Sequence, residues 1–226
     1  MYLLYLIITV LIVAGALIRK SMSRSTLEII HPAREAKGSA KLLYLRSFKL
    51  DGKGWVTTNT DIFEGLNLFP PELDLAKAFI KFDFHLIAVG RPGEKIPEIG
   101  FDRKYFNNDV WQQEVIKLIS ESVLIIYRPD PSDAVLWEFE QVLNAKASDK
   151  LMIWANMGYN TDIKLNKVRY NIFKKKAFER LQEELPEFNK FKGWIALDAQ
   201  GCWKSFSGLG MKQIPAYIKA TAGRKI

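Results

Sequence analysis

Cysteine and histidine are almost absent from this chain of 226 residues, and their scarcity excludes two classes of site. Cys202 is the single cysteine, so the chain forms no internal disulfide. His31 and His85 are its two histidines, too few to build a metal centre of His and Cys ligands with one cysteine. We therefore expect no metal site. The sequence also lacks internal repeats and low-complexity tracts.

Charged residues are absent from residues 1–18, an apolar run that ends at Arg19 and Lys20. A helix of that length, at about 1.5 Å a residue, spans roughly 27 Å, close to the hydrocarbon thickness of a bilayer. The basic residues follow the run instead of preceding it, which favours a retained anchor over a cleaved signal peptide. We predict a transmembrane anchor at 1–19 and a juxtamembrane linker at 20–40, with the N-terminus outside and the domain in the cytoplasm.

The chain is basic overall, with 33 Lys and Arg against 25 Asp and Glu and a formal charge of +8. An excess of this kind suits an anionic partner, either a nucleic acid or the inner surface of a lipid bilayer. The basic segment from Lys164 to Lys176 has aromatic residues only at Tyr170 and Phe173. This pattern indicates a solvated or lipid-facing helix and argues against a nucleic-acid surface.

Apolar runs alternate with helical patterns along the rest of the chain, which predicts one α/β domain at 41–200 and a C-terminal tail at 201–226. Five runs are expected to be strands: 41–48, 84–90, 122–127, 151–154 and 193–197. Helical spacing predicts two pieces within 60–82 and helices near 109–120, 134–145 and 166–184. We therefore expect a five-stranded parallel flavodoxin-like sheet in the order 2-1-3-4-5, with helices on both faces and one transmembrane helix before it.

In that order the switch point lies between the first and third strands, and open α/β sheets bind ligands outside the carboxyl ends there. The first strand ends in Arg46-Ser-Phe48, the third in Arg128-Pro-Asp130, and Gly90-Arg-Pro-Gly93 follows the second. Arginine at such positions can bind phosphate through its fork of donors. The alternative is ordinary surface solvation and a plain Gly/Pro loop. The predicted nucleotide-binding residues are Arg46, Ser47, Phe48, Arg91, Gly93, Asp130 and Trp137.

Two carboxylates, Glu138 and Glu140, come just after the third strand, at the start of a predicted helix. Cleavage of an N-glycosidic bond passes through a transition state that resembles an oxocarbenium ion, so a carboxylate beside the ribose can stabilise it. The two side chains are about 200° apart around a helix and cannot both face one cleft. We take Glu138 as the first catalytic candidate and Glu140 as the second. The competing interpretation is a glutamate favoured by the helix dipole.

Several short segments also resemble a known family: Leu45-Arg-Ser-Phe48, Val89-Gly-Arg-Pro-Gly-Glu94, Asp109-Val-Trp111-Gln and Leu136-Trp-Glu-Phe139. Over about residues 41–198 the chain resembles bacterial membrane-anchored proteins with the TIR-like fold, which is similar in turn to the nucleoside 2-deoxyribosyltransferases. TIR domains place their glutamate in a Ser-x-x-x-Trp-x-x-x-Glu pattern. Here Ser132 lies five residues before Trp137, and Glu138 fits better the Glu-Leu-Gly step of the deoxyribosyltransferases.

The resemblance implies that NAD or a related nucleotide is a substrate and not a cofactor, and that its N-glycosidic bond is hydrolysed. It also implies a homo-oligomer at the bacterial inner membrane that acts in defence or signalling. The alternative is a non-catalytic TIR-like interaction scaffold at the same membrane. Release of nicotinamide by the purified protein separates these two hypotheses.

Overall fold

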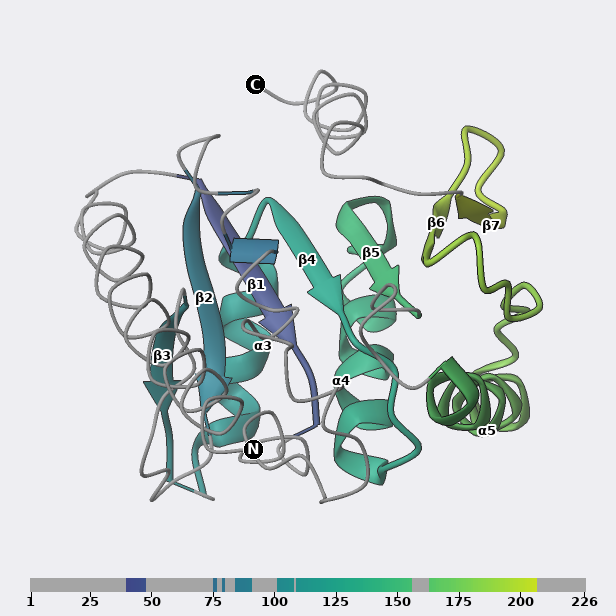
Figure 1. The fold of residues 1–226 in the computed structure, drawn as a ribbon. Coiled ribbons are helices and arrows are strands. Elements are labelled where there is room, and N and C mark those ends of the chain that lie inside the picture. The colour runs from purple at the N-terminus through teal and green to yellow at the C-terminus, as the bar shows by residue number, and fades with distance from the viewer. Residues whose placement is uncertain are drawn as a thin grey trace, which may run out of the picture.

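Seven strands form the sheet of this protein in its computed structural model: β1 (Lys41–Leu45), β2 (His85–Gly90), β3 (Asp102–Tyr105), β4 (Leu124–Tyr127), β5 (Leu151–Trp154), β6 (Trp194–Leu197) and β7 (Trp203–Phe206). They lie side by side in the order β3-β2-β1-β4-β5-β6-β7 (Figure 1). The structure describes residues 40–47, 75–76, 79, 84–90, 101–107, 109–155 and 163–206.

The predicted five-stranded parallel sheet is wrong, because the sheet has seven strands and is mixed. Strands β3, β2, β1, β4 and β5 are parallel, whereas β6 runs antiparallel to β5 and β7 antiparallel to β6. The five predicted strands do lie in the predicted order, β2-β1-β4-β5-β6, with β3 added outside β2 and β7 outside β6. The topology therefore keeps the switch point beside β1.

Both additional strands are at the edges of the sheet, where a strand need not be apolar. Neither sequence therefore contains a continuous apolar run that predicts a strand. The sequence of β3 is Asp102-Arg-Lys-Tyr105, and charged side chains are common on edge strands, where they discourage pairing with another chain. Strand β7 follows β6 across a tight turn in which the Asp198 carboxylate accepts the backbone N–H groups of Gln200 and Cys202, each at 2.9 Å. Strand β7 thus occupies part of the predicted C-terminal tail.

The strand side chains alternate between two hydrophobic cores, one on each face of the sheet. Leu43 and Leu45 of β1 pack into the core beneath α3 (Trp111–Glu121), α4 (Asp133–Asn144) and α5 (Ile163–Leu181). Leu42 and Tyr44 pack into the opposite core with the helical residues at 75–76 and 79. Figure 1 shows α3 and α4 behind the strands, with the strands running across them. Helical residues therefore cover both faces.

The predicted helices near 109–120, 134–145 and 166–184 correspond to α3, α4 and α5, with ends displaced by up to three residues. A one-turn helix, η3 (Ser148–Lys150), leads into β5. The predicted anchor at 1–19 and nearly all of the linker at 20–40 lie outside the described residues. In the described ranges, no helix combines the length and the apolar character that crossing a membrane requires.

Candidate functional site

The carboxyl ends of β1 and β4 meet at one edge of the sheet, which we call the carboxyl edge. Leu45 pairs with Tyr127 at the last position of both strands, and the backbone N–H of Arg128 donates to the Leu45 carbonyl at 2.9 Å. This bond places Arg46 beside Arg128 as the chains leave the sheet. The two segments that follow, Arg46-Ser47 and Arg128-Pro-Asp130, therefore begin side by side at the switch point.

Glu138 is a buried carboxyl group on α4, the helix that follows β4. It lies in the second turn of α4, not the first, and its side chain shares the inward face of that helix with Val135 and Val142. Glu138 is only 3% exposed, and its Oε2 has no hydrogen-bond partner among the described residues. Burial raises the pKa of Glu138 from 4.5 to about 8, so the side chain is mainly neutral at pH 7.

A carboxyl group in this state is unusual in a protein interior. Buried polar atoms are nearly always hydrogen-bonded, and an isolated buried charge is strongly unfavourable. A strongly perturbed carboxyl at a place where folds of this class bind ligands is therefore a candidate functional group. The helix-dipole interpretation is weaker for Glu138, because the dipole acts mainly within the first turn.

Tyr127 lies close to both Glu138 and Asp130. The phenol of Tyr127 is fully buried and donates a hydrogen bond of 2.8 Å to the carbonyl of Val135 in α4. Burial, and then the charges of Glu138 and Asp130, raise the pKa of the Tyr127 phenol well above its usual value. The buried Asp130 carboxylate accepts the N–H of Ser132 at 3.0 Å, which shapes the turn that leads into α4.

Glu140, the second catalytic candidate, faces away from this group. Its Oε2 accepts a hydrogen bond of 2.7 Å from Nη2 of Arg180 in α5. The pair is partly exposed, with 27% of the Glu140 side chain and 46% of the Arg180 side chain accessible. Glu140 therefore joins α4 to α5, and its position agrees with the separation of about 200° between the two glutamates.

Arg46 and Glu138 are on opposite faces of the sheet. Arg46 is 3% exposed, and its guanidinium carbon lies 5.9 Å from the centre of the Tyr44 ring, on the face that α4 does not cover. Glu138 belongs to α4 and lies on the other face. The sequence led us to expect one crevice for both residues. In the structure, a ligand must pass over the carboxyl edge to contact both.

The remaining predicted site residues divide into two groups. Ser47 is buried next to Arg46, and Trp137 is half-buried, with its ring edge to face against Trp111 at 4.8 Å between centroids. Trp137 thus contributes to the contact between α3 and α4. Phe48, Arg91 and Gly93 lie outside the described residues. Sequence reasoning missed Tyr127, although its place as the last residue of a buried run was a usable signal.

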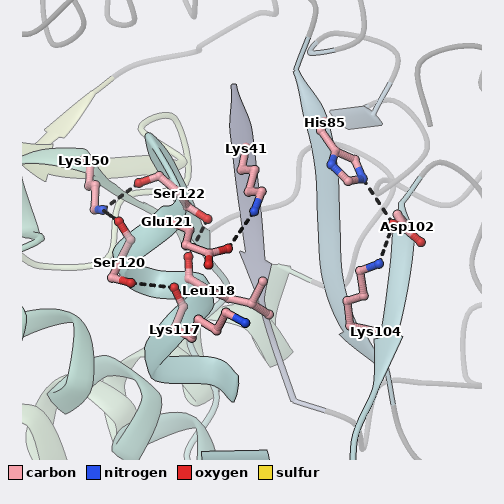
Figure 2. A network of polar contacts seen from close by, with 10 residues as sticks. All are labelled: Lys41, His85, Asp102, Lys104, Lys117, Leu118, Ser120, Glu121, Ser122 and Lys150. Atoms are coloured by element: carbon pink, nitrogen blue, oxygen red, sulfur yellow. Dashed lines mark hydrogen bonds and ion pairs between the residues drawn. The ribbon is translucent and has the colours of Figure 1, made fainter. Parts of the chain in front are cut away.

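Figure 2 shows a second set of polar contacts, which belongs to the opposite edge of the sheet. Lys41, the first residue of β1, pairs with Glu121 at 2.6 Å, and His85, the first residue of β2, lies 3.1 Å from Asp102 of β3. Lys104 also pairs with Asp102, at 3.0 Å. These contacts join the beginning of β1 to the end of α3 and the beginning of β2 to β3. The described part of the chain holds no group of three or more His, Cys, Asp or Glu side chains that could bind a metal.

Comparison with protein-family models, with curated proteins and with solved structures finds no match to this chain. The resemblance to TIR-like proteins therefore stays a prediction from the sequence. The function must be inferred from the chemistry of the carboxyl edge, where a neutral buried carboxyl lies beside a buried phenol.

Proposed function

We propose that this protein binds NAD or a related nucleotide at the carboxyl edge and hydrolyses its N-glycosidic bond, with Glu138 as the catalytic carboxylate. The observation that carries the proposal is the Glu138 side chain, buried without a hydrogen bond to its Oε2 among the described residues. Its position beyond a parallel strand at the switch point supports the same role.

The chemistry needs a negative charge that appears when the ligand arrives. The nicotinamide ring of NAD carries a positive charge, and an adjacent cation lowers the pKa of a carboxyl group. Binding of NAD beside Glu138 would thus release a proton from a carboxyl whose pKa is about 8 in the free protein. The resulting carboxylate, shielded from water, interacts strongly with the sugar.

Bond cleavage then follows the pattern of glycoside hydrolysis. The bond between the ribose anomeric carbon and the nicotinamide nitrogen breaks, and its electron pair leaves with nicotinamide. The Glu138 carboxylate stabilises the oxocarbenium character of the ribose. Water then adds to the anomeric carbon and loses a proton, which Glu138 can accept. The products are nicotinamide and ADP-ribose.

The second candidate function is the non-catalytic scaffold. The exposed apolar residues Leu165, Val168 and Ile172 favour it, since they recur at helical spacing on the outer side of α5 and suit self-association of the chain. The same surface supports the proposed homo-oligomer of an enzyme. The proposed location, the cytoplasmic side of the bacterial inner membrane, rests on the sequence of residues 1–20.

Nicotinamide release by the full chain tests the proposal, with Glu138→Gln beside the matched variant Glu140→Gln. Both substitutions remove one carboxylate from α4, but only Glu138 lies in the buried group. We expect Glu138→Gln to lower kcat by about 100-fold or more, the effect typical of a lost transition-state contact, and Glu140→Gln to change it little. Equal rates in all three proteins would refute the enzymatic role. A wild-type chain that self-associates and releases nothing would support the scaffold.

A further inference from the structure

Helix α5 carries apolar side chains on its outer side as well as on the side that packs into the core. The inner side contributes the buried residues Tyr170, Phe173 and Ala177. On the outer side, Val168 and Ile172 are 55% and 43% exposed, and they lie one turn apart on the same face. The helix is the last of the row α3, α4 and α5 (Figure 1), so its outer side points away from the helical layer.

Lysine side chains surround these two apolar residues. Lys164 lies one turn before Val168, Lys167 is the residue next to Val168, and both lysines are exposed. Lys175 follows Val168 by seven residues, so it is about 20° from it around the helix, and its side chain is 76% exposed. We call these five residues, Lys164, Lys167, Val168, Ile172 and Lys175, the outer face of α5.

The local sequence is strongly basic, which limits the partners that this face can bind. Residues 163–178 include six Lys and Arg and no Asp or Glu. A twofold contact between two copies of the outer face would bring the lysines of both copies together, and like charges repel. A nucleic acid would match the charge, but valine and isoleucine offer no surface on which bases can stack.

An anionic lipid surface matches both properties of the outer face. Helices that lie on a bilayer place lysines toward the headgroup phosphates and apolar side chains at the boundary with the acyl chains. Each lysine near such a surface adds to the attraction. The lysines and the two apolar residues of α5 lie on one side of a single helix, so all of them can contact a lipid surface at once.

We propose that the outer face of α5 lies on an anionic lipid surface, with its lysines at the headgroup phosphates and Val168 and Ile172 at the boundary with the acyl chains. This contact deepens the proposed location at the inner membrane and does not depend on NAD hydrolysis. It gives the domain one orientation on the membrane, with α5 between the bilayer and the sheet.

The same orientation places the carboxyl edge near the membrane. Asn166 and Arg169, on inner positions of α5, line a small hollow with Arg128 and Trp154, which are at the carboxyl ends of β4 and β5. A helix with its side chains is about 10 Å across. The strand ends would therefore lie roughly one helix diameter from the lipid.

A fluorophore that responds to the polarity of its surroundings tests this contact in the full chain. Cys202→Ser removes the single cysteine, and Val168→Cys then provides a labelling site on the outer face. Val123→Cys is the matched control, because Val123 is 54% exposed and lies at the opposite edge of the sheet, before β4. We expect the emission at position 168 to shift to the blue with vesicles of equal parts phosphatidylcholine and phosphatidylglycerol. Vesicles of phosphatidylcholine alone should have little effect, and position 123 should respond to neither.

The lysines are tested in the same assay. Replacing both Lys164 and Lys167 by Gln should raise the vesicle concentration for half of the shift about thirtyfold, as expected for two lysines at an anionic surface. Replacing Lys117 and Lys146 by Gln removes the same charge from exposed positions outside α5 and should have little effect. Added salt should weaken the shift of the unsubstituted helix, which tests the charge without any change to α5.

Three results would overturn the proposal: equal shifts at positions 168 and 123, equal shifts with the two kinds of vesicle, or equal effects of the two lysine pairs. A shift at position 168 that needs no vesicles and grows with protein concentration would assign the face to self-association and also overturn it. An anchor at residues 1–18 would act on both vesicle types and both labelled positions, so the comparison reports on α5. Nicotinamide release is a separate measurement, so this proposal and the hydrolase can fail independently.

Discussion

Tyr127 at the end of β4 and Glu138 in α4 are buried close to each other, and burial and then the Glu138 charge raise the pKa of the Tyr127 phenol. The phenol donates a hydrogen bond to the Val135 carbonyl, 2.8 Å away. Neither side chain ionises readily in this environment. The proposed reaction requires Glu138 to lose its proton when a cationic ligand binds beside it, and a carboxyl that is neutral in the free protein has this property.

Stability should fall as the pH rises if Glu138 is buried as described. The folded-state pKa of about 8 exceeds the ordinary value of 4.5, so unfolding releases a proton between these two pH values. Stability is therefore greatest at the low end of this window and is lost as the pH rises toward 8. Relative to Glu138→Gln, the wild type should lose roughly 3 kcal/mol between about pH 5 and pH 8. Urea unfolding of both proteins measures this difference, and parallel pH profiles would contradict it.

The ion pair between Glu140 and Arg180 should contribute little to stability. Both side chains are partly exposed, so the attraction across 2.7 Å is weakened by solvent. Replacing either residue by Gln should cost about 0.2–1 kcal/mol, and the double replacement should cost no more than the sum. Urea unfolding of the two single variants and the double variant measures this coupling. A coupling energy of several kcal/mol would mean that Glu140 is more deeply buried than its exposure indicates.

Lys150 should contribute more to stability than the Glu140–Arg180 pair, because its side chain binds the carbonyl groups at the C-terminus of α3. Its ammonium donates to the carbonyls of Ser120 and Ser122 at 3.4 and 2.6 Å (Figure 2). It also donates to the carbonyl of Ile119 at 2.8 Å. Carbonyl groups at the end of a helix have no partner within the helix. The cation also complements the negative end of the helix dipole. We expect Lys150→Met to destabilise the domain by about 1–2 kcal/mol. Thermal unfolding checks this value, with Lys146→Met as a control on an exposed lysine nearby.

The sequence was sufficient for the parts of the fold that rest on local signals. Buried runs identified β1, β2, β4 and β5, and helical periodicity located α3 and α4. It was not sufficient for β3 or β7, because a short edge strand with a charged or polar composition looks like a loop. The antiparallel direction of β6 also could not be predicted, because it depends on where the chain returns to the sheet after α5 and not on the residues of the strand.

The candidate site, like the fold, could be predicted from the sequence only in part. The spacing of Glu138 and Glu140 predicted that they point in different directions, and the structure agrees: Glu138 is buried on the inward face of α4, and Glu140 pairs with Arg180 of α5. The burial of Glu138 depends on packing against distant elements, and the sequence could not supply it. The sequence also placed Arg169 on a solvated or lipid-facing helix, and in the structure it is half-buried and lines a small hollow with Arg128 and Trp154.

The pH dependence of nicotinamide release from NAD by the full chain tests the central claim most directly. In the proposed reaction the reactive form is the Glu138 carboxylate, and burial raises the pKa of this group to about 8. We predict that kcat/KM rises about tenfold for each pH unit and levels off near pH 8, whereas kcat levels off at a lower pH because bound NAD lowers the pKa. A kcat/KM that is constant between about pH 6 and pH 9 would contradict the account, since a different group would then limit the reaction.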